Sequence, residues 1–411
     1  MSMPLLGIRV MDLGAFIAAP YATSILASLG AEVVKVEPLP PGEAYRRGRD
    51  VADEYFVQYN AGKKSLSIDL KNPLGRTVVD RLLETCDVLV HNLRPGKAEK
   101  LDLGFEQLAP RLPQLVYAAV SGFGNVGPLS QRPGYDSVAQ SISGIFSLCS
   151  PTGTFQAGGL SSISDLTTGV VTALGVCAKL ADRARSGTGG LVETSLFEVS
   201  TMLSTEGMAY QAGNLKADAL VNGRSDTEYV PYSARSQAYC LVCADGAPVT
   251  LAVGDSEEQW SALAQLATSQ SPTESHTYRT LDYGQRVREY PAIREALQRS
   301  LSHVDSETLL SQLRELGVPA TLVRTYREAV TRSSGEVSQV PQMASGQVDL
   351  LNPGFRIDGE WPSREPKVPR IGEDTREILS SLGLGDSIEE LAAEQAIHCA
   401  PQLDRCGTES S

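Results

Sequence analysis

Asp165 is a carboxylate placed at the start of a helical segment. Apolar residues recur with helical spacing from Leu166 to Leu180, and the Ser-Gly-Thr-Gly-Gly stretch at residues 186–190 ends the pattern. The positive end of a helix favours the ionised form of a nearby carboxylate. Asp is also a favoured helix N-cap. The position therefore suits both a structural cap and a carboxylate that does chemistry.

Basic side chains that could hold a phosphate are concentrated in the first hundred residues. The chain has 36 Lys+Arg and 49 Asp+Glu, a net charge of −13, whereas residues 1–100 carry 13 and 12, a net of +1. A chain this acidic is a poor candidate for nucleic acid or an anionic membrane. A phosphate-bearing ligand would bind in the first hundred residues, although scattered solubilising charge gives the same pattern. The basic residues there include Arg46, Arg47, Arg49, Lys63, Lys64, Lys71, Arg76, Arg94, Lys97 and Lys100.

Cysteines and histidines do not indicate a metal or redox site. Seven cysteines are widely spread in a chain of 411 residues, which is typical of a reduced, cytoplasmic protein. Cys240 and Cys243 form one Cys-x-x-Cys inside a β-branched and aromatic run, which favours a strand. No two of the four histidines have ligand spacing, and no Gly-x-Ser-x-Gly is present. We therefore expect no metal, and no apolar run is long enough to predict a membrane span.

Alternating strands and helices position these residues. Strands are expected at residues 8–13, 32–36, 88–90 and 115–121, with helices at 20–29 and 73–85 and an irregular stretch before the second helix. This alternation predicts βαβ crossovers and an α/β fold with a mainly parallel sheet. Ligands of such sheets bind beyond the carboxyl ends of the strands. The segments after residues 13, 36, 90 and 121 are therefore the expected binding loops.

A glycine motif after the last of these strands imitates a dinucleotide site. Residues 122–127 fit Gly-x-Gly-x-x-Gly. Pro128 and Pro133 follow at once, so no regular helix can present its N–H groups to a pyrophosphate. A nicotinamide or flavin site is therefore not favoured.

The rest of the chain combines helices with a hairpin. Helices are expected from Asp165 and at residues 191–209, 375–382 and 387–396, and a strand at 320–324. A hairpin is expected at 239–253, around the Asp245-Gly246 turn. Residues 222–232 are polar and irregular, 333–370 extended, and 399–411 a frayed tail.

Seven segments, in order, resemble the class III CoA-transferase family, which also contains the α-methylacyl-CoA racemases. They are residues 6–13, 29–38, 63–71, 92–96, 121–128, 369–375 and 379–383. The resemblance covers nearly the whole chain. It implies a Rossmann-like large domain at 1–205, completed by 335–411, with a smaller α+β domain at 206–334. It also implies an interlocked homodimer.

The resemblance implies that Asp165 is the catalytic nucleophile. Asp165 follows Tyr135 by 30 residues and precedes Gly169, as in the transferases, although Ser164 stands where Gly is commonest. Attack on an acyl-CoA thioester would release CoA thiolate and leave a mixed anhydride. The thiolate would then form an aspartyl-CoA thioester, from which a small carboxylic acid takes CoA. This chemistry requires no cofactor beyond CoA.

The family's contact positions, taken one at a time, imply a CoA site. Ile17 and Ala18 would lie near the thioester. Some formate and oxalate transferases have Gln at the position of Ile17 and a basic residue at that of Pro38, so the resemblance favours a bulkier or less polar acyl group here than oxalate. The adenosine, phosphate and pantetheine contacts would be Ile68, Asp69, Leu70, Lys71, Asn92, Leu93, Arg94, Lys97, Lys100, Arg132 and Tyr135.

Two alternatives remain at this point. A 2-methylacyl-CoA racemase of this family uses a His where this chain has Tyr135, whose pKa of about 10 is too high for an efficient base. Glu257 resembles a racemase acidic position, but it is incomplete without the His. A CoA-binding protein without catalysis is the second alternative.

Overall fold

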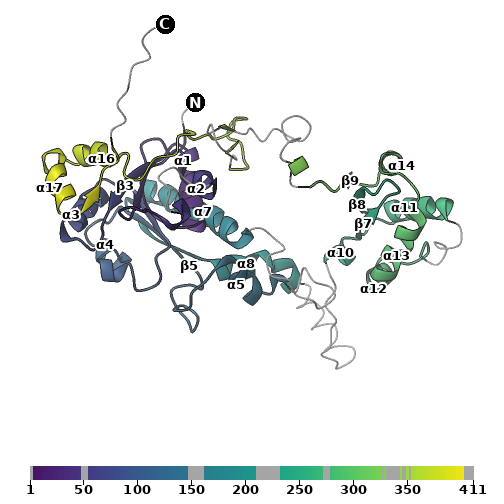
Figure 1. The fold of residues 1–411 in the computed structure, drawn as a ribbon. Helices are drawn as coiled ribbons and strands as arrows, with labels where there is room; N and C mark the ends of the chain where they lie inside the picture. The colour runs from purple at the N-terminus through teal and green to yellow at the C-terminus, as the bar shows by residue number, and fades with distance from the viewer. Residues whose placement is uncertain are drawn as a thin grey trace, which may run out of the picture. The chain divides into compact units, whose positions relative to one another are not determined.

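The chain forms two compact units. The computed structural model describes residues 3–47, 54–146, 162–209, 232–271, 278–325, 327–329, 343–344, 349–350 and 353–401 (Figure 1). The large unit comprises Met1–Ser143, Ala157–Leu203 and Ser338–Ser411. The small unit comprises Gly144–Gln156 and Ser204–Val337.

A seven-stranded sheet forms the centre of the large unit, which confirms the predicted α/β architecture. Its order is β12-β3-β2-β1-β4-β5-β6, and every pair is parallel except β12 with β3. The C-terminal strand β12 thus closes the edge, with Ile397 opposite Ile68. The strands are β1 (Arg9–Leu13), β2 (Glu32–Glu37), β3 (Lys64–Ile68), β4 (Val88–His91), β5 (Val116–Ser121), β6 (Gly190–Ser195) and β12 (Ile397–His398).

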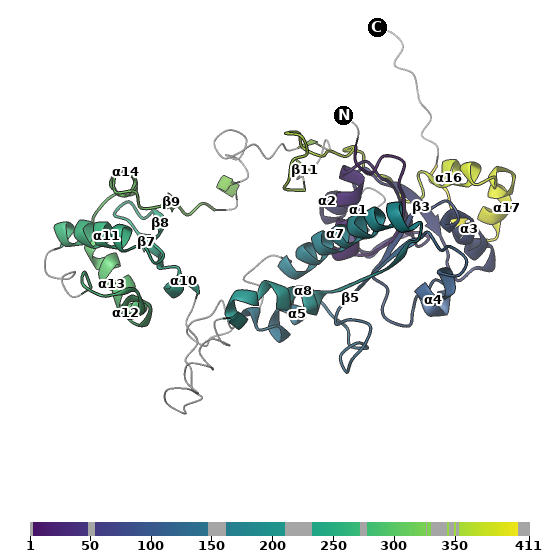
Figure 2. The ribbon, with the colours of Figure 1, turned by 180° about the vertical axis from the view of Figure 1, so that it is seen from behind.

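Helices cover both faces of this sheet, because successive side chains of a strand point to opposite faces. Val10 packs with α1 (Ala18–Ser28) and α7 (Ile163–Ser186), which lie side by side in Figure 2. Met11 packs on the other face with α3 (Pro73–Leu83), α16 (Thr375–Ser381) and α17 (Ile388–Ala393). The remaining helices of this unit are η1 (Ala44–Arg46), α2 (Glu54–Asn60), η2 (Glu99–Leu101), α4 (Phe105–Leu108), α5 (Asp136–Ile142), α8 (Leu196–Leu203) and η3 (Gly385–Ser387).

Within the described residues, α7 is the one helix long and apolar enough to cross a membrane. It has 24 residues, and 39% of its most apolar window is buried. Length and composition alone are weak grounds for a span, because core helices of soluble proteins share both properties. Ala173, Val176 and Leu180 of α7 pack into the core beneath α1.

The small unit is α+β. Three antiparallel strands, β7 (Ala238–Val242), β8 (Pro248–Ala252) and β9 (Ala320–Leu322), lie in sequence order, and β7 and β8 form the expected hairpin. Trp260 and Leu263 pack on Tyr239 and Leu251 in its core. Among its described residues, helices include α10 (Tyr232–Arg235), α11 (Glu257–Gln270), α12 (Tyr283–Arg288), α13 (Tyr290–Leu301) and α14 (Ser306–Glu315). Two short strands, β10 (Met343–Ala344) and β11 (Asp349–Leu350), pair separately.

Two expectations about elements are wrong. The helix expected at 191–209 begins only at Leu196, because Val192 and Thr194 extend as part of β6 beside β5. Residues 64–68, expected to be irregular, form β3. Most of the irregular segment expected at 222–232, and most of the tail at 399–411, lie outside the described residues.

Candidate active site

Asp165 lies in the first turn of α7, but it does not cap this helix. Oδ1 of Asp136, at the start of α5, accepts the backbone N–H groups of Ser164 at 2.8 Å and Asp165 at 3.1 Å. Gln140 in turn donates to the other Asp136 oxygen. Asp136 therefore supplies the cap from a neighbouring helix. The Asp165 carboxylate has no hydrogen-bond partner among the described residues, which leaves it available for a ligand.

Burial raises the pKa of Asp165 to about 7, and the nearby Asp136 carboxylate adds to the rise. The expectation that the helix end keeps this acid ionised is therefore wrong for the unliganded protein, because desolvation outweighs the helix dipole. Asp165 is mostly ionised only above neutral pH. A perturbed acid at the wall of a cleft is a recurrent property of catalytic groups.

Asp165 lines a cleft of about 350 Å³ in the large unit. The cleft contains six of the residues expected to contact CoA, although Tyr135 is 61% exposed. Four loops that follow strands of the sheet contribute to it, as expected for a parallel sheet. Its lining residues are Phe16, Ala18, Tyr45, Asn92, Leu93, Arg94, Pro95, Val120, Ser121, Gly122, Ser130, Arg132, Pro133, Gly134, Tyr135, Asp165 and Leu196.

A second cleft, of about 700 Å³, shares Leu93 with the first. It contains the expected adenosine and phosphate contacts Ile68, Asp69, Leu70, Lys71 and Lys97. Lys71 and Lys97 are exposed at its rim, whereas Ile68 is buried. The two clefts therefore bring together most of the expected CoA residues at the carboxyl ends of β1 to β5.

Two expected contacts line neither cleft. Ile17 is only 4% exposed and precedes α1, where its carbonyl accepts the N–H of Tyr21 at 2.7 Å. Lys100 is exposed on η2.

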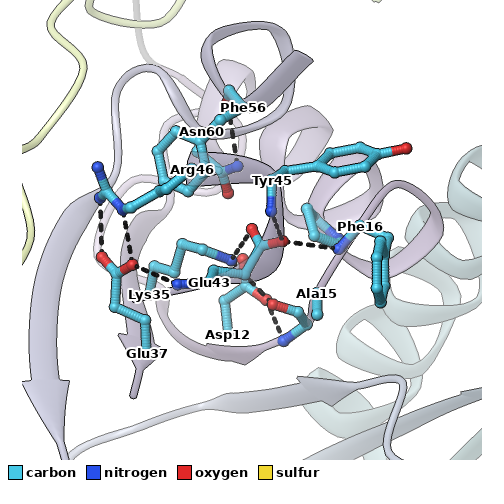
Figure 3. Close-up of polar contacts among 12 residues, drawn as sticks. Asp12, Ala15, Phe16, Lys35, Glu37, Glu43, Tyr45, Arg46, Phe56 and Asn60 are labelled. Carbon is cyan, nitrogen blue, oxygen red and sulfur yellow. Dashed lines mark hydrogen bonds and ion pairs between the residues drawn. The ribbon is translucent and has the colours of Figure 1, made fainter. Parts of the chain in front are cut away.

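A buried group of charges fixes the loop that follows β1 and borders both clefts (Figure 3). Asp12 accepts the N–H of Gly14 at 2.7 Å and binds the ammonium of Lys63 at 2.8 Å. Lys35 donates to the Gly14 carbonyl at 2.8 Å. Burial raises the pKa of Asp12, but attraction to Lys63 and Lys35 more than offsets this and holds it below its ordinary value. The group, which we call the charge cluster, comprises Asp12, Lys35, Glu37, Glu43, Arg46 and Lys63.

Two of the basic residues predicted to meet a phosphate belong to this cluster instead. Arg46 is fully buried and binds both oxygens of Glu37, at 2.7 and 2.8 Å. Lys63 donates to Asp12, to Asn60 and to the Pro20 carbonyl. Neither cation faces a cleft, because each is held by partners inside the large unit.

Asn92 and His91 hold the loop that follows β4. Asn92 exchanges two hydrogen bonds with the backbone of Ala15, at 2.9 and 2.6 Å. Nδ1 of His91 accepts the N–H of Leu93 at 3.2 Å, and Nε2 donates to the Tyr117 hydroxyl at 2.8 Å. Tyr117 donates onward to the Leu103 carbonyl at 2.9 Å, which fixes this tautomer. Burial lowers the pKa of His91 to about 4, so the ring stays neutral. No sequence motif had indicated His91 as a positioning residue.

Gly169 lets α7 approach the start of α1. A Cβ at this position would lie 2.9 Å from the Ala18 carbonyl oxygen and 2.9 Å from the Tyr21 ring. Asp165 lies one turn before Gly169 on α7. The close approach of the two helices therefore places Asp165 beside the start of α1. Backbone N–H groups in the first turn of a helix have no intrahelical acceptor.

Glu257, the expected racemase acid, is engaged in the small unit. Its two oxygens accept from both terminal nitrogens of Arg286 at 2.9 Å. The hydrogen bonds from Arg286 hold the pKa of Glu257 below its ordinary value. Across the described residues, no group of three His, Cys, Asp or Glu side chains is arranged to hold a metal.

A mainly parallel sheet with two adjoining clefts at the carboxyl ends of its strands defines an α/β protein that binds a ligand there, and sequence comparison specifies the family. The chain belongs to CoA-transferase family III, whose model matches residues 5–375. It is a class III CoA-transferase.

Two curated relatives and a solved structure match most of the chain. The succinyl-CoA:glutarate CoA-transferase of Mus musculus is 28% identical and the match covers 92% of this chain and 86% of the relative. The acetyl-CoA:oxalate CoA-transferase of Acetobacter aceti is 29% identical, and the match covers 90% of this chain and 93% of the relative. The crystal structure of a CAIB/BAIF family protein from Brucella suis is 28% identical in sequence and matches with a TM-score of 0.78. The match covers 93% of this chain and 100% of that protein. The two relatives are named for different acids.

Proposed function

We propose that this enzyme moves CoA from an acyl-CoA to a free carboxylic acid through covalent intermediates on Asp165. The observation that carries the proposal is the Asp165 carboxylate, which lines the cleft with no hydrogen-bond partner among the described residues while Asp136 caps its helix. A free carboxylate is the form in which this side chain can attack a thioester.

The proposed reaction balances without a redox or metal step. An oxygen of Asp165 attacks the thioester carbonyl, the C–S bond breaks, and CoA leaves as the thiolate. The thiolate then attacks the Asp165 carbonyl of the mixed anhydride, which releases the first acid as a carboxylate and leaves an aspartyl-CoA thioester. The acceptor carboxylate repeats both steps in reverse, so Asp165 is regenerated and the acceptor carries CoA.

The two clefts divide the proposed work of binding. Lys71 and Lys97 at the rim of the larger cleft suit the phosphates of CoA, and Ile68 and Leu70 offer apolar contact to the adenosine. Arg132 and Tyr135 line the route toward Asp165. Each tetrahedral oxyanion needs donors, and the backbone N–H groups of Ala18 and Ala19 in the first turn of α1 are the candidates.

A covalent trap tests the proposal. The protein is incubated with an acyl-CoA, treated with hydroxylamine or borohydride, and digested for peptide mass mapping. We expect modification of Asp165 alone and none in Asp165→Asn. Turnover without modification at Asp165 would contradict the mechanism.

The same samples separate the alternatives. A racemase would introduce deuterium at the α-carbon of a 2-methylacyl-CoA in D2O, without any acceptor acid. The engagement of Glu257 by Arg286 and the Tyr at position 135 both disfavour this reaction. A non-catalytic CoA-binding protein would bind CoA but give neither modification nor exchange.

We further propose a cytoplasmic homodimer. Its support in the large unit is an apolar surface on α5 and α7, where Val138, Ile142 and Val170 are exposed and Leu174 is 67% exposed. Light scattering is expected to give twice the chain mass of 43.9 kDa, and Leu174→Glu to weaken the dimer. In this proposal the exposed apolar side chains of α7 pack against the second copy of the chain and not against a membrane.

A further inference from the structure

Two aromatic side chains form one wall of the Asp165 cleft. Phe16 and Tyr45 both line it, and their rings meet edge to face with centroids 5.4 Å apart. Phe16 is 44% exposed, which is unusual for a large apolar side chain in an otherwise buried loop. Burial raises the pKa of Tyr45, and the charge of Asp165 is the next cause, so this ring lies near the proposed nucleophile.

One carboxylate oxygen fixes the backbone of both aromatic residues. Oε1 of Glu43 accepts the N–H of Phe16 at 3.0 Å and the N–H of Tyr45 at 3.1 Å (Figure 3). Glu43 is buried, and its other oxygen lies 3.5 Å from the ammonium of Lys35 in the charge cluster. The pair of rings is therefore held in place before a ligand arrives, which lowers the entropic cost of binding against it.

The backbone of Phe16 adopts a conformation that bulky residues rarely take. Its φ is 65°, in the left-handed region. A strained backbone of this kind persists only where the surrounding contacts enforce it, and it is found most often at functional sites. In Figure 3 the rings of Phe16 and Tyr45 point to the same side, away from the buried Glu37–Arg46 pair. The strained residue thus presents its ring to the cleft.

The surroundings of Asp165 do not favour a second negative charge. Burial and the charge of Asp136 both raise the pKa of Asp165. Arg94 and Arg132 line the same cleft, and the family resemblance implies that both contact CoA. Arg47 is separated from Tyr45 by the ring of Tyr55. The Arg47 guanidinium lies 5.8 Å from the centre of the Tyr55 ring, and the centres of the Tyr55 and Tyr45 rings are 5.8 Å apart.

We propose that Phe16 and Tyr45 select aryl and arylalkyl carboxylic acids over small or doubly charged ones. The inference rests on the proposed function, because it places the acyl group of the Asp165 anhydride against these two rings. A substrate ring would pack edge to face or offset on this pair, the arrangements that aromatic groups prefer.

The experiment measures kcat/KM for CoA transfer from acetyl-CoA to phenylacetate, propionate and succinate. We expect phenylacetate to be preferred. Phe16→Gly is the decisive variant, since glycine accepts a positive φ while the ring is removed. Its preference for phenylacetate over propionate should fall about tenfold, in line with the loss of one apolar contact surface. Tyr45→Leu should reduce the preference in the same direction, and circular dichroism checks that both variants fold.

Arg47→Gln serves as the matched control and should leave the ratio of phenylacetate to propionate unchanged. A preference for succinate that depends on Arg47, or a preference for phenylacetate that survives Phe16→Gly, would overturn the inference.

Failure of the inference is distinguishable from failure of the proposed function. Trapping of Asp165 with acetyl-CoA tests the mechanism whatever acid is preferred. If no acid accepts CoA, ligand-observed NMR of phenylacetate and propionate on the CoA-saturated protein decides the inference. Selective phenylacetate binding that Phe16→Gly abolishes would support it, and equal binding of the two acids would refute it.

Discussion

Oδ1 of Asp136 accepts the backbone N–H of Asp165 at 3.1 Å, so one acid caps the helix that carries the other. The arrangement has two effects. It leaves the Asp165 side chain without a structural task, and it adds a negative charge to the burial that raises the pKa of Asp165. The properties of the proposed nucleophile therefore depend on a residue that need not touch the substrate.

The rate of CoA transfer should fall as the pH is lowered through about 7. The nucleophile must be ionised, and burial with the Asp136 charge raises the pKa of Asp165 to about 7. Above this pH the acid is ionised and the rate levels off, whereas below it the rate drops about tenfold per pH unit. A pH profile of kcat/KM checks this expectation. An acid limb near the ordinary value for Asp, 3.8, would contradict it.

Asp136→Asn should move this acid limb to lower pH. The amide keeps an oxygen that can accept from Ser164 and Asp165, but it removes the charge that raises the pKa of Asp165. Gln140 can turn its amide to meet the new NH2, because its oxygen has no hydrogen-bond partner now. Asp136→Ala is the comparison, since it also removes the cap and should lower the free energy of unfolding by about 1 kcal/mol. An unshifted limb in Asp136→Asn would refute the electrostatic role.

Gly169→Ala should lower kcat more than it raises KM for CoA. The added methyl would lie 2.9 Å from the Ala18 carbonyl oxygen, so α1 and α7 must separate close to Asp165. A misplacement of about 1 Å costs on the order of a hundredfold in rate, so a smaller separation near Asp165 should still lower kcat measurably. Gly187→Ser is the control, because a side chain at that helix end meets open space. Its glycine has a φ of 74°, so a modest loss of stability without a specific loss of kcat is expected. Steady-state kinetics of both variants distinguish the two effects.

Lys63→Met and Lys64→Met should differ sharply in stability although the residues are adjacent. Lys63 is buried against Asp12, so its loss removes the direct ion-pair partner of a buried carboxylate and should lower the free energy of unfolding by about 3 to 5 kcal/mol. Lys64 is 34% exposed in its pairs with Glu32 and Glu377, so its loss should cost less than about 1 kcal/mol. Urea denaturation followed by circular dichroism compares them. Equal losses would contradict the structural role assigned to the charge cluster.

The sequence could predict the parallel sheet because short, mostly apolar strands alternate with helical patterns. Strand β3 was missed because Ser65 and Ser67 interrupt its apolar pattern, yet both are buried. Ser65 donates to Glu37 at 2.6 Å and Ser67 to the Pro38 carbonyl at 3.0 Å. Partners at the end of β2 satisfy these hydroxyls and so make their burial possible, and the periodicity of the sequence does not reveal such partners.

Only part of the candidate site could be predicted, because some of its contacts join residues that are far apart in the sequence. The position of Asp165 follows from its helix and from family motifs. The charge distribution indicates the first hundred residues, and the family's contact positions imply the basic rim residues within them. The pairing of Lys63 with Asp12, however, joins residues 51 positions apart, and a bare lysine in sequence does not reveal its partner. Asp136 likewise caps α7 from another helix, so no local capping pattern in the sequence could predict this contact.

The pairing of β12 with β3 has a consequence for biosynthesis. Ile397 lies opposite Ile68, and the N–H of Asp69 binds the Ala396 carbonyl at 2.9 Å. Strand β3, which ends at the larger cleft, is therefore paired on this side by residues that are translated long after it. The small unit leaves the ribosome while this edge is still open, so it can fold ahead of the large one. A nascent chain stalled before residue 396 lacks this closing strand, so β3 remains an unpaired edge of the sheet until β12 has been made.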